Sequence, residues 1–271
     1  MYLDRLGRKG LYWLDSFGDY AHFVGSIFFW MFRGAGRFAR QQLLAQMYEI
    51  GTMSVPVVMV TGGFIGMVLA IEAYPQFQAI GFAGRIGSVI NISVVKQIGP
   101  VLTAVMLAGR VGGALTAELG TMKVTEQLDA LRAMASDPIR TLVVPRFLAC
   151  LLMMPALTIC SDWVGALGGW FMSVQVLGVD GHEYMQHTRD SLDMYTVYSG
   201  LIKSVFFGAA IASVACYKGF NCSSGAQGVG KACTEAFVAA FVAILVMNFF
   251  LAMLLNTIYT ILYPNQTSLF G

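Results

Sequence analysis

The stretch AFVAAFVAILVMNFFLAMLLNTIYTILY, residues 236–263, contains no charged side chain and decides the fold class. About 20 apolar residues are enough for a helix to cross roughly 30 Å of hydrocarbon. Residues 52–71 are also uncharged, and residues 147–179 carry Asp162 as their single charge. These stretches predict membrane-spanning helices, because a soluble protein of this length could not bury so much apolar surface.

The composition agrees with a membrane protein. Hydrophobic residues make up 57% of the 271 positions and charged residues only 12%, against roughly 25% in soluble domains. The net charge of +2 is small and the basic residues are dispersed, so no nucleic-acid-binding surface is predicted. The five cysteines are odd in number and lack metal-ligand spacing, so we predict neither a metal site nor another cofactor.

We expect about five membrane-spanning helices. The predicted crossings are residues 52–74, one segment within 86–119, 147–177, 196–217 and 236–263. The second is the least clear from hydropathy, because Lys96 and Arg110 interrupt it. The third is long enough for one tilted helix or for two short segments. The sequence therefore predicts an all-α polytopic membrane protein.

The N-terminal 50 residues have a different composition. Aromatic residues are mixed with six lysines and arginines, and the apolar run 23–32 is too short to span a bilayer. Such a composition suits helices that lie in the headgroup layer. We therefore expect interfacial or elbow helices over residues 1–50 and a single transmembrane domain over residues 51–271.

The distribution of basic residues predicts the orientation. Twelve lysines and arginines lie in the N-terminal segment and in the loops 118–146 and 218–231, against two in the alternate connections. Cytoplasmic segments of membrane proteins are enriched in lysine and arginine. The N-terminus and both loops are therefore predicted to be cytoplasmic, and five crossings place residues 264–271 outside.

The predicted cytoplasmic loop 118–146 contains an amphipathic helix at about residues 124–135. Its apolar face comprises Val124, Leu128, Leu131 and Ala135. The dipeptide Asp137-Pro138 is expected to end the helix. A short amphipathic helix at this place is suited to packing against the membrane face or against another protein.

Two stretches approach known motifs without completing them. GAQGVGKA at 225–232 nearly spells a P-loop, but Ala232 stands where a Ser or Thr must hold magnesium, and a membrane span precedes it. HEYMQH at 182–187 resembles a zinc-protease motif, but its histidines are five apart rather than four and do not share a helix face. We interpret the first as a flexible turn and the second as a solvated loop, and we predict no catalytic residue.

Charged residues inside the predicted spans need partners, because each costs roughly 2.5–3.5 kcal/mol at the bilayer centre. Lys96, Arg110, Asp162 and Lys203 are such residues. For Arg110 and Lys203, one interpretation is a position near a helix end from which the side chain reaches the headgroup layer. For Lys96, a polar lining inside the protein is the alternative.

Glycines recur four positions apart within the predicted spans. The pairs are Gly62 and Gly66, Gly109 and Gly113, and Gly165 and Gly169. This spacing lets helix backbones approach closely. Packing within one chain is the simpler interpretation, and a contact between two copies is the alternative.

The longest informative stretch is GPVLTAVMLAGRVGGALTAELGTMKVTEQLDAL at 99–131, followed by MASDPIR at 134–140 and PR at 145–146. It closely resembles the MlaE-type permease family. The members of that family are membrane subunits of bacterial ABC transporters that act with MCE-domain proteins on phospholipids. The resemblance extends over roughly residues 41–263.

The resemblance implies a homodimer in the bacterial inner membrane, with two cytoplasmic ATPase subunits below it and a hexameric MCE-domain ring in the periplasm. Phospholipid is the implied cargo, and the chain itself is implied to be no enzyme. The helix at 124–135 resembles the coupling helix that docks in the ATPase. The residues implied in coupling are Glu118, Glu126, Leu128, Leu131 and Asp137.

The family's lipid cavity carries over by position to this chain. The lipid-binding residues implied are Leu69, Tyr74, Phe77, Ile80, Lys96, Gln97 and Ile98. The family commonly has Arg-Glu-Leu-Gly-Pro where this chain has KQIGP at 96–100. The basic charge is retained and can meet a lipid phosphate as a point charge, but the acidic residue is replaced by a neutral amide.

The resulting hypothesis is a lipid-transport permease driven by ATP that a partner hydrolyses. One alternative is an intramembrane enzyme that modifies lipids through Asp162, or through His182 with His187. The sequence supplies no paired nucleophile and base for it. The other alternative is a passive membrane anchor for a periplasmic lipid-carrying ring.

Overall fold

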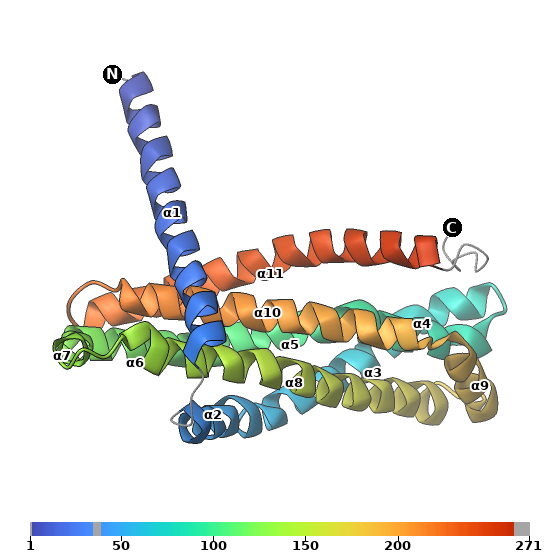
Figure 1. The fold of residues 1–271 in the computed structure, drawn as a ribbon. Helices are drawn as coiled ribbons and strands as arrows, with labels where there is room; N and C mark the ends of the chain where they lie inside the picture. Colours follow the sequence, from blue (N-terminus) through green and yellow to red (C-terminus); the bar gives the residue numbers. More distant parts are fainter. Residues whose placement is uncertain (1, 35–38, 263–271) are drawn as a thin grey trace.

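The computed structural model describes residues 2–34 and 39–262 of the chain (Figure 1). Within these ranges the elements are helices joined by short turns, and no strand occurs. In chain order they are α1 (Tyr2–Gly34), α2 (Ala39–Met47), η1 (Tyr48–Thr52), α3 (Val55–Ala79), η2 (Ala83–Arg85), α4 (Ile86–Ser93), η3 (Val94–Ile98), α5 (Gly99–Leu107), η4 (Ala108–Gly112), α6 (Gly113–Val124), α7 (Gln127–Ala133), η5 (Ile139–Val143), α8 (Val144–Trp170), η6 (Phe171–Val176), α9 (Gly181–Ser191), α10 (Met194–Phe220) and α11 (Ala226–Leu262). The all-α prediction is confirmed.

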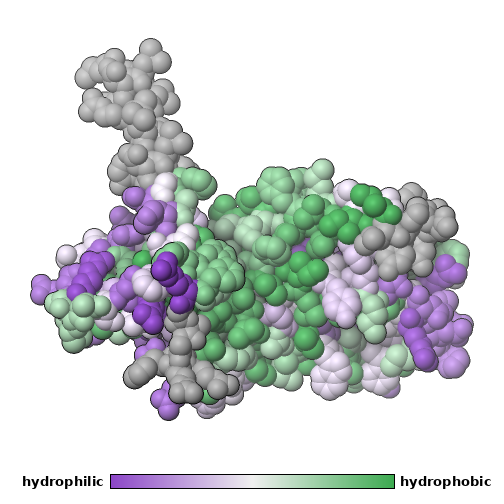
Figure 2. Space-filling model, viewed as in Figure 1, coloured by the Kyte–Doolittle hydropathy of each residue, from purple (hydrophilic) through white to green (hydrophobic). Residues whose placement is uncertain are grey.

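Five helical segments of the described chain are long and apolar enough to cross a bilayer. They are Gln41–Ala79, Ala83–Val124, Ile139–Val176, Met194–Phe220 and Ala226–Ile261. Apolar side chains form a broad band across the middle of the molecule, between two hydrophilic ends (Figure 2). These features confirm a polytopic membrane protein with five crossings.

The structure resolves the two crossings that hydropathy left open. The second is one continuous helical run that contains both Lys96 and Arg110, and the third is one segment rather than two. Lys96 lies in the π-helical turn η3 and Arg110 in the π-helical turn η4. Such turns inside longer helices are frequent at functional sites.

Two predicted boundaries are wrong. α3 continues through Pro75 to Ala79, because membrane helices tolerate the one backbone N–H that proline lacks. α11 begins at Ala226, ten residues before the predicted start, so the last part of the predicted loop 218–231 is helical. The predicted exterior placement of residues 264–271 lies outside the described residues.

α1 runs at a steep angle to the spanning helices (Figure 1). Its C-terminal half contacts the bundle, where the ring of Phe23 lies 5.7 Å from the ring of Tyr217. The hydroxyl groups of Tyr20 and Ser213 share a hydrogen bond of 2.8 Å. This course is compatible with a helix along the membrane surface. The interfacial location and the division of the chain at residue 50 stay predictions.

The closest helix contact in the bundle joins α3 to α8. A Cβ atom at Gly66 would overlap the backbone carbonyl of Gly165, and one at Gly62 would lie 2.6 Å from the carbonyl oxygen of Ser161. Helix association in lipid depends on such small residues, because the lipid tails are as apolar as the side chains. The glycine pairs of α3 and α8 therefore pack within one chain, as the simpler interpretation predicted.

α10 forms the centre of the bundle and α11 lies at its edge. In the most apolar part of each helix, 67% of the α10 residues are buried, against 17% for α11. Around α10, the main hydrophobic core gathers residues such as Phe147, Leu157, Phe207 and Ile211. α11 therefore leaves most of its apolar surface uncovered by the described chain.

We predict that Gly66→Ala lowers the stability of the solubilised protein by about 1–3 kcal/mol, because the added methyl group forces α3 away from α8. Thermal unfolding followed by fluorescence-detected size exclusion measures the effect. Gly113→Ala is the control, since its Cβ meets no atom within 4 Å. Equal melting temperatures for the two variants would contradict the assigned contact.

Candidate functional site

The predicted coupling helix is shorter than its sequence pattern indicated. Val124 ends α6, and α7 spans only Gln127–Ala133. Glu126 and Ala135 adopt left-handed backbone conformations, with φ of 60° and 55°, and these break the helix on both sides. The predicted apolar face of four residues is therefore wrong at Val124 and Ala135, which lie outside α7.

The described side chains of this region divide into buried and exposed groups. Leu128 is buried and Leu131 is half-buried, so both hold α7 against the bundle. Glu126 is exposed at the turn before α7, and Met134 is 70% exposed directly after it. Met134 is therefore a single exposed apolar side chain beside a charged turn.

The two remaining coupling residues bind within the chain. A carboxylate oxygen of Glu118 lies 2.8 Å from the guanidinium of Arg146, whose side chain is buried. Oδ1 of Asp137 accepts a hydrogen bond of 2.8 Å from the backbone N–H of Ile139. These contacts fix α6 to α8 and cap η5. The two carboxylates therefore hold the segments directly before and after α7 in place.

Lys203 is buried in α10 with an exposed fraction of 1%. The interpretation that its side chain reaches the headgroup layer is therefore wrong. Its Nζ donates hydrogen bonds to the carbonyl oxygen of Lys96 at 3.0 Å and to Oε1 of Gln97 at 2.5 Å. Sequence reasoning missed this contact, and the only available signal was the charge of Lys203 inside a span.

Lys96 and Arg110 have separate surroundings. Nζ of Lys96 lies 6.0 Å from the ring centre of Tyr259 in α11, which is within the range of a cation–π interaction. Nη1 of Arg110 donates a hydrogen bond of 2.8 Å to Oγ of Ser54, at the start of α3. The polar lining at Lys96 inside the protein stays a prediction.

A cavity of about 380 Å³ is lined by residues of α3, α4 and α9. α4 and α9 lie at the end of the bundle opposite α7 (Figure 1). Two predicted lipid-binding residues, Phe77 and Ile80, contribute to its wall. Val89 and Ile92 add apolar surface, and Arg85 adds a positive charge. An apolar cavity with one cation is suited to a molecule with a hydrocarbon body and an anionic group.

The structure does not bring the other predicted lipid-binding residues into this cavity. Leu69 and Tyr74 are partly buried and pack against a small core that includes Ile86 and Ile90. Lys96, Gln97 and Ile98 lie together on η3, and each is half-buried. The seven predicted residues therefore form three neighbouring groups along the second half of α3 and the segment α4–η3. These residues are Leu69, Tyr74, Phe77, Ile80, Lys96, Gln97 and Ile98.

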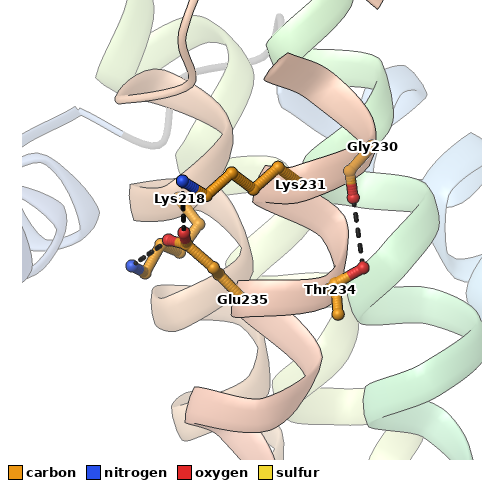
Figure 3. Close-up of polar contacts among 5 residues, drawn as sticks. All are labelled: Lys218, Gly230, Lys231, Thr234 and Glu235. Atoms are coloured by element: carbon orange, nitrogen blue, oxygen red, sulfur yellow. Dashed lines mark hydrogen bonds and ion pairs between the residues drawn. The ribbon is translucent and has the colours of Figure 1, made fainter. Parts of the chain in front are cut away.

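The near-P-loop at 225–232 has the wrong conformation for a phosphate site. From Ala226 onward it is part of α11, and the carbonyl of Gly230 accepts a hydrogen bond of 3.2 Å from Oγ1 of Thr234 (Figure 3). Glu235 lies 2.8 Å from Nζ of Lys218 and 3.9 Å from Nζ of Lys231 (Figure 3). Lys231, the lysine of the near-P-loop, therefore joins an ion-pair cluster between α10 and α11. The interpretation as a flexible turn is wrong for this helical part.

The second motif is helical as well. His182 and His187 lie on α9, which Asp180 caps through hydrogen bonds to two backbone N–H groups. Among the described residues no group of three His, Cys, Asp or Glu side chains is arranged for a metal ion. The buried Oδ1 of Asp162 has no hydrogen-bond partner in the described chain. The interpretation of residues 182–187 as a solvated loop is wrong, because these residues are helical.

We predict that Lys203→Met destabilises the protein by about 1–3 kcal/mol, because it leaves the Lys96 carbonyl and the Gln97 amide without their donor. Thermal unfolding in detergent measures the loss. Lys231→Met is the matched control, since the Lys231 side chain is 76% exposed. If both variants melt at the same temperature, the contact does not support the fold.

The family described as Permease MlaE matches residues 43–254. A probable ABC transporter permease protein of Synechocystis is 39% identical over 93% of this chain and 95% of its own length. The intermembrane phospholipid transport system permease protein MlaE of Haemophilus influenzae is 37% identical over 77% of this chain and 80% of its own length. The chloroplast protein trigalactosyldiacylglycerol 1 of Arabidopsis thaliana is 35% identical over 80% of this chain and 62% of its own length. With most of its length matched to one family, this chain belongs to the MlaE permease family.

Proposed function

We propose that this chain is the membrane subunit of an ABC transporter that moves phospholipids between the inner membrane and a periplasmic MCE-domain hexamer. The observation that carries the proposal is the family match over residues 43–254. Relatives named as ABC transporter permeases, and one named as a phospholipid transport permease, support the substrate and the class of machine. ATP is hydrolysed by a separate cytoplasmic subunit, and this chain performs no chemistry itself.

The lipid path runs along the second half of α3 and the segment from α4 to η3. Acyl chains contact Phe77 and Ile80, whose cavity supplies apolar walls. The phosphate lies near Lys96, which keeps a point charge suited to it. The remaining residues of the path are Leu69, Tyr74, Gln97 and Ile98. Because Gln97 is bonded to Lys203, it contributes by shaping the turn that carries Lys96.

The ATPase docks at the end of the bundle that carries α7. Glu126 and Met134 are exposed there and make the direct contact. Leu128 and Leu131 pack inward, and Glu118 and Asp137 hold the flanks, so these residues transmit the movement of α7 to the spans. The N-terminus and this end are cytoplasmic, as the positive-inside rule predicts. The end with α9 then faces the periplasm and the MCE-domain hexamer.

The homodimer contact is assigned to α11, whose outer face the described chain leaves uncovered. Large apolar side chains are exposed along this helix, including Val242, Leu245, Phe249, Phe250 and Met253. A second copy packed on this face encloses the lipid path between two chains. A scaffold that only anchors a ring has no use for a lipid path.

We expect Met134→Asp to weaken the binding of the ATPase subunit by about tenfold, because a charge replaces an apolar side chain in the proposed contact. Co-purification of the ATPase from membranes measures the binding. Met134 is preferable to the buried Leu128, whose substitution would disturb the bundle itself. Met194→Asp is the control, since Met194 is 76% exposed at the opposite end. Full ATPase recovery with Met134→Asp would refute the coupling assignment.

We expect the double variant Phe77→Ser and Ile80→Ser to retain about tenfold less phospholipid, because it removes two apolar side chains from the path. Mass spectrometry of lipid extracted from the purified complex measures the retained amount. Phe171→Ser on the outer surface of η6 is the control, since that side chain is exposed.

Loss of lipid with normal assembly of the complex excludes the passive anchor. Unchanged lipid content would contradict the proposed path. Turnover of lipid by the isolated chain without ATP would favour the intramembrane enzyme instead.

A further inference from the structure

A second cavity, of about 290 Å³, lies between η1 and the segment η4–α6. It shares no lining residue with the cavity of Phe77 and Ile80. Three charged side chains line it, namely Glu49 of η1, Arg110 of η4 and Glu118 of α6. All three are exposed, so a ligand in the cavity can reach their charged groups. We call this cavity the η1–η4 pocket.

The charges of the η1–η4 pocket do not neutralise one another. Among the described side chains, no ion pair joins Arg110 to Glu49 or Glu118, and the carboxylate of Glu49 has no partner. Arg110 donates one hydrogen bond, to Ser54, and a guanidinium has five N–H groups. One oxygen of Glu118 lies 2.8 Å from Arg146. The pocket therefore offers free donors on one wall and free acceptors on the others.

The pocket lies where the apolar surface of α3 begins. Met53 lines it and stands two residues before the start of α3, in the half of the bundle that carries α7 (Figure 1). From Met53, exposed apolar side chains continue along α3 at Val57, Val60 and Phe64. Their spacing of three or four places them on one helix face. A headgroup in the pocket can therefore extend its acyl chains along α3 into the membrane.

The chemistry of the pocket restricts the headgroup. Unpaired charges at the border of hydrocarbon are unfavourable, and a ligand with both signs of charge would pair them. The planar guanidinium of Arg110 matches a phosphate, and Glu49 and Glu118 suit a cation. An anionic headgroup without an ammonium group would place its charge beside two carboxylates. A quaternary ammonium has no N–H group to donate, so it forgoes the charge-assisted hydrogen bonds that a primary ammonium makes.

We propose that the η1–η4 pocket binds the headgroup of a phospholipid with a primary ammonium group, such as phosphatidylethanolamine. The phosphate lies on Arg110, and the ammonium lies between Glu49 and Glu118. The site does not depend on the proposed transport function, because it lies outside the proposed lipid path. The rival is a second copy of the chain that covers the pocket, so that Arg110 contacts protein rather than lipid.

The test uses the full-length protein in detergent and native mass spectrometry with two probes. Dioleoyl phosphatidylethanolamine and dioleoyl phosphatidylcholine differ only by the methyl groups on the nitrogen. We expect the first to reach half-saturation at an about tenfold lower concentration, because its N–H groups donate to the carboxylates. The double variant Phe77→Ser and Ile80→Ser is expected to keep this preference, which separates the pocket from the lipid path. Equal half-saturation of the two probes would overturn the proposal.

Three variants locate the effect. Glu49→Gln is expected to reduce the preference to about threefold or less, because only Glu118 then remains for the ammonium. Arg110→Gln is expected to weaken the binding of both lipids by about tenfold. Ala114→Phe fills the pocket and leaves its charges in place, so it is expected to abolish the preference. This third variant keeps the test valid if Arg110→Gln does not fold.

Two controls remove exposed charges that do not line the pocket. They are Glu72→Gln and Lys123→Gln, and both are expected to leave the binding of the two lipids unchanged. A tenfold preference that survives Glu49→Gln would refute the site. Dissociation of a dimer by Arg110→Gln with an unchanged lipid preference would favour the rival and overturn the proposal.

Discussion

The backbone contact between α3 and α8 is the interaction on which the rest of the bundle depends. In lipid, apolar side chains gain little by leaving one apolar environment for another, so close packing must supply the attraction. Glycines at positions 62, 66, 165 and 168 remove the side chains that would separate the two helices. Once α3 and α8 are joined, α10 fills the space beside them and α11 remains at the edge.

Polar contacts inside the spans fix the relative position of neighbouring helices along their axes. Apolar packing alone would allow several such positions. Lys203 ties α10 to η3, Arg110 ties η4 to the start of α3, and Arg146 ties α8 to α6. Each such contact is directional, so it selects one relative position of two helices. Because charge is costly in hydrocarbon, these side chains also resist separation. The bundle is therefore held in register by a few charged groups.

The second crossing connects the two ends of the molecule without interruption. The run Ala83–Val124 starts beside the cavity of Phe77 and Ile80, passes Lys96 and Arg110, and ends at the turn before α7. A displacement of α7 by a partner would therefore reach the proposed lipid path along one helical run. The π-helical turns η3 and η4 are the places in this run where the helix geometry changes.

The sequence by itself determined the membrane class, the five crossings and the resemblance to one family, because apolar length and the continuous stretch 99–146 are local properties of the chain. Two helix ends were missed: α3 continues through Pro75, which a membrane helix tolerates, and α11 begins among the glycines at 225–230. Only the tertiary structure decided which polar groups meet. Lys203 and Gln97 are 106 positions apart, and Asn91 and Tyr184 are 93 apart, so no local pattern could pair them. Their partners follow from the packing of helices, which is set by shape across the whole bundle.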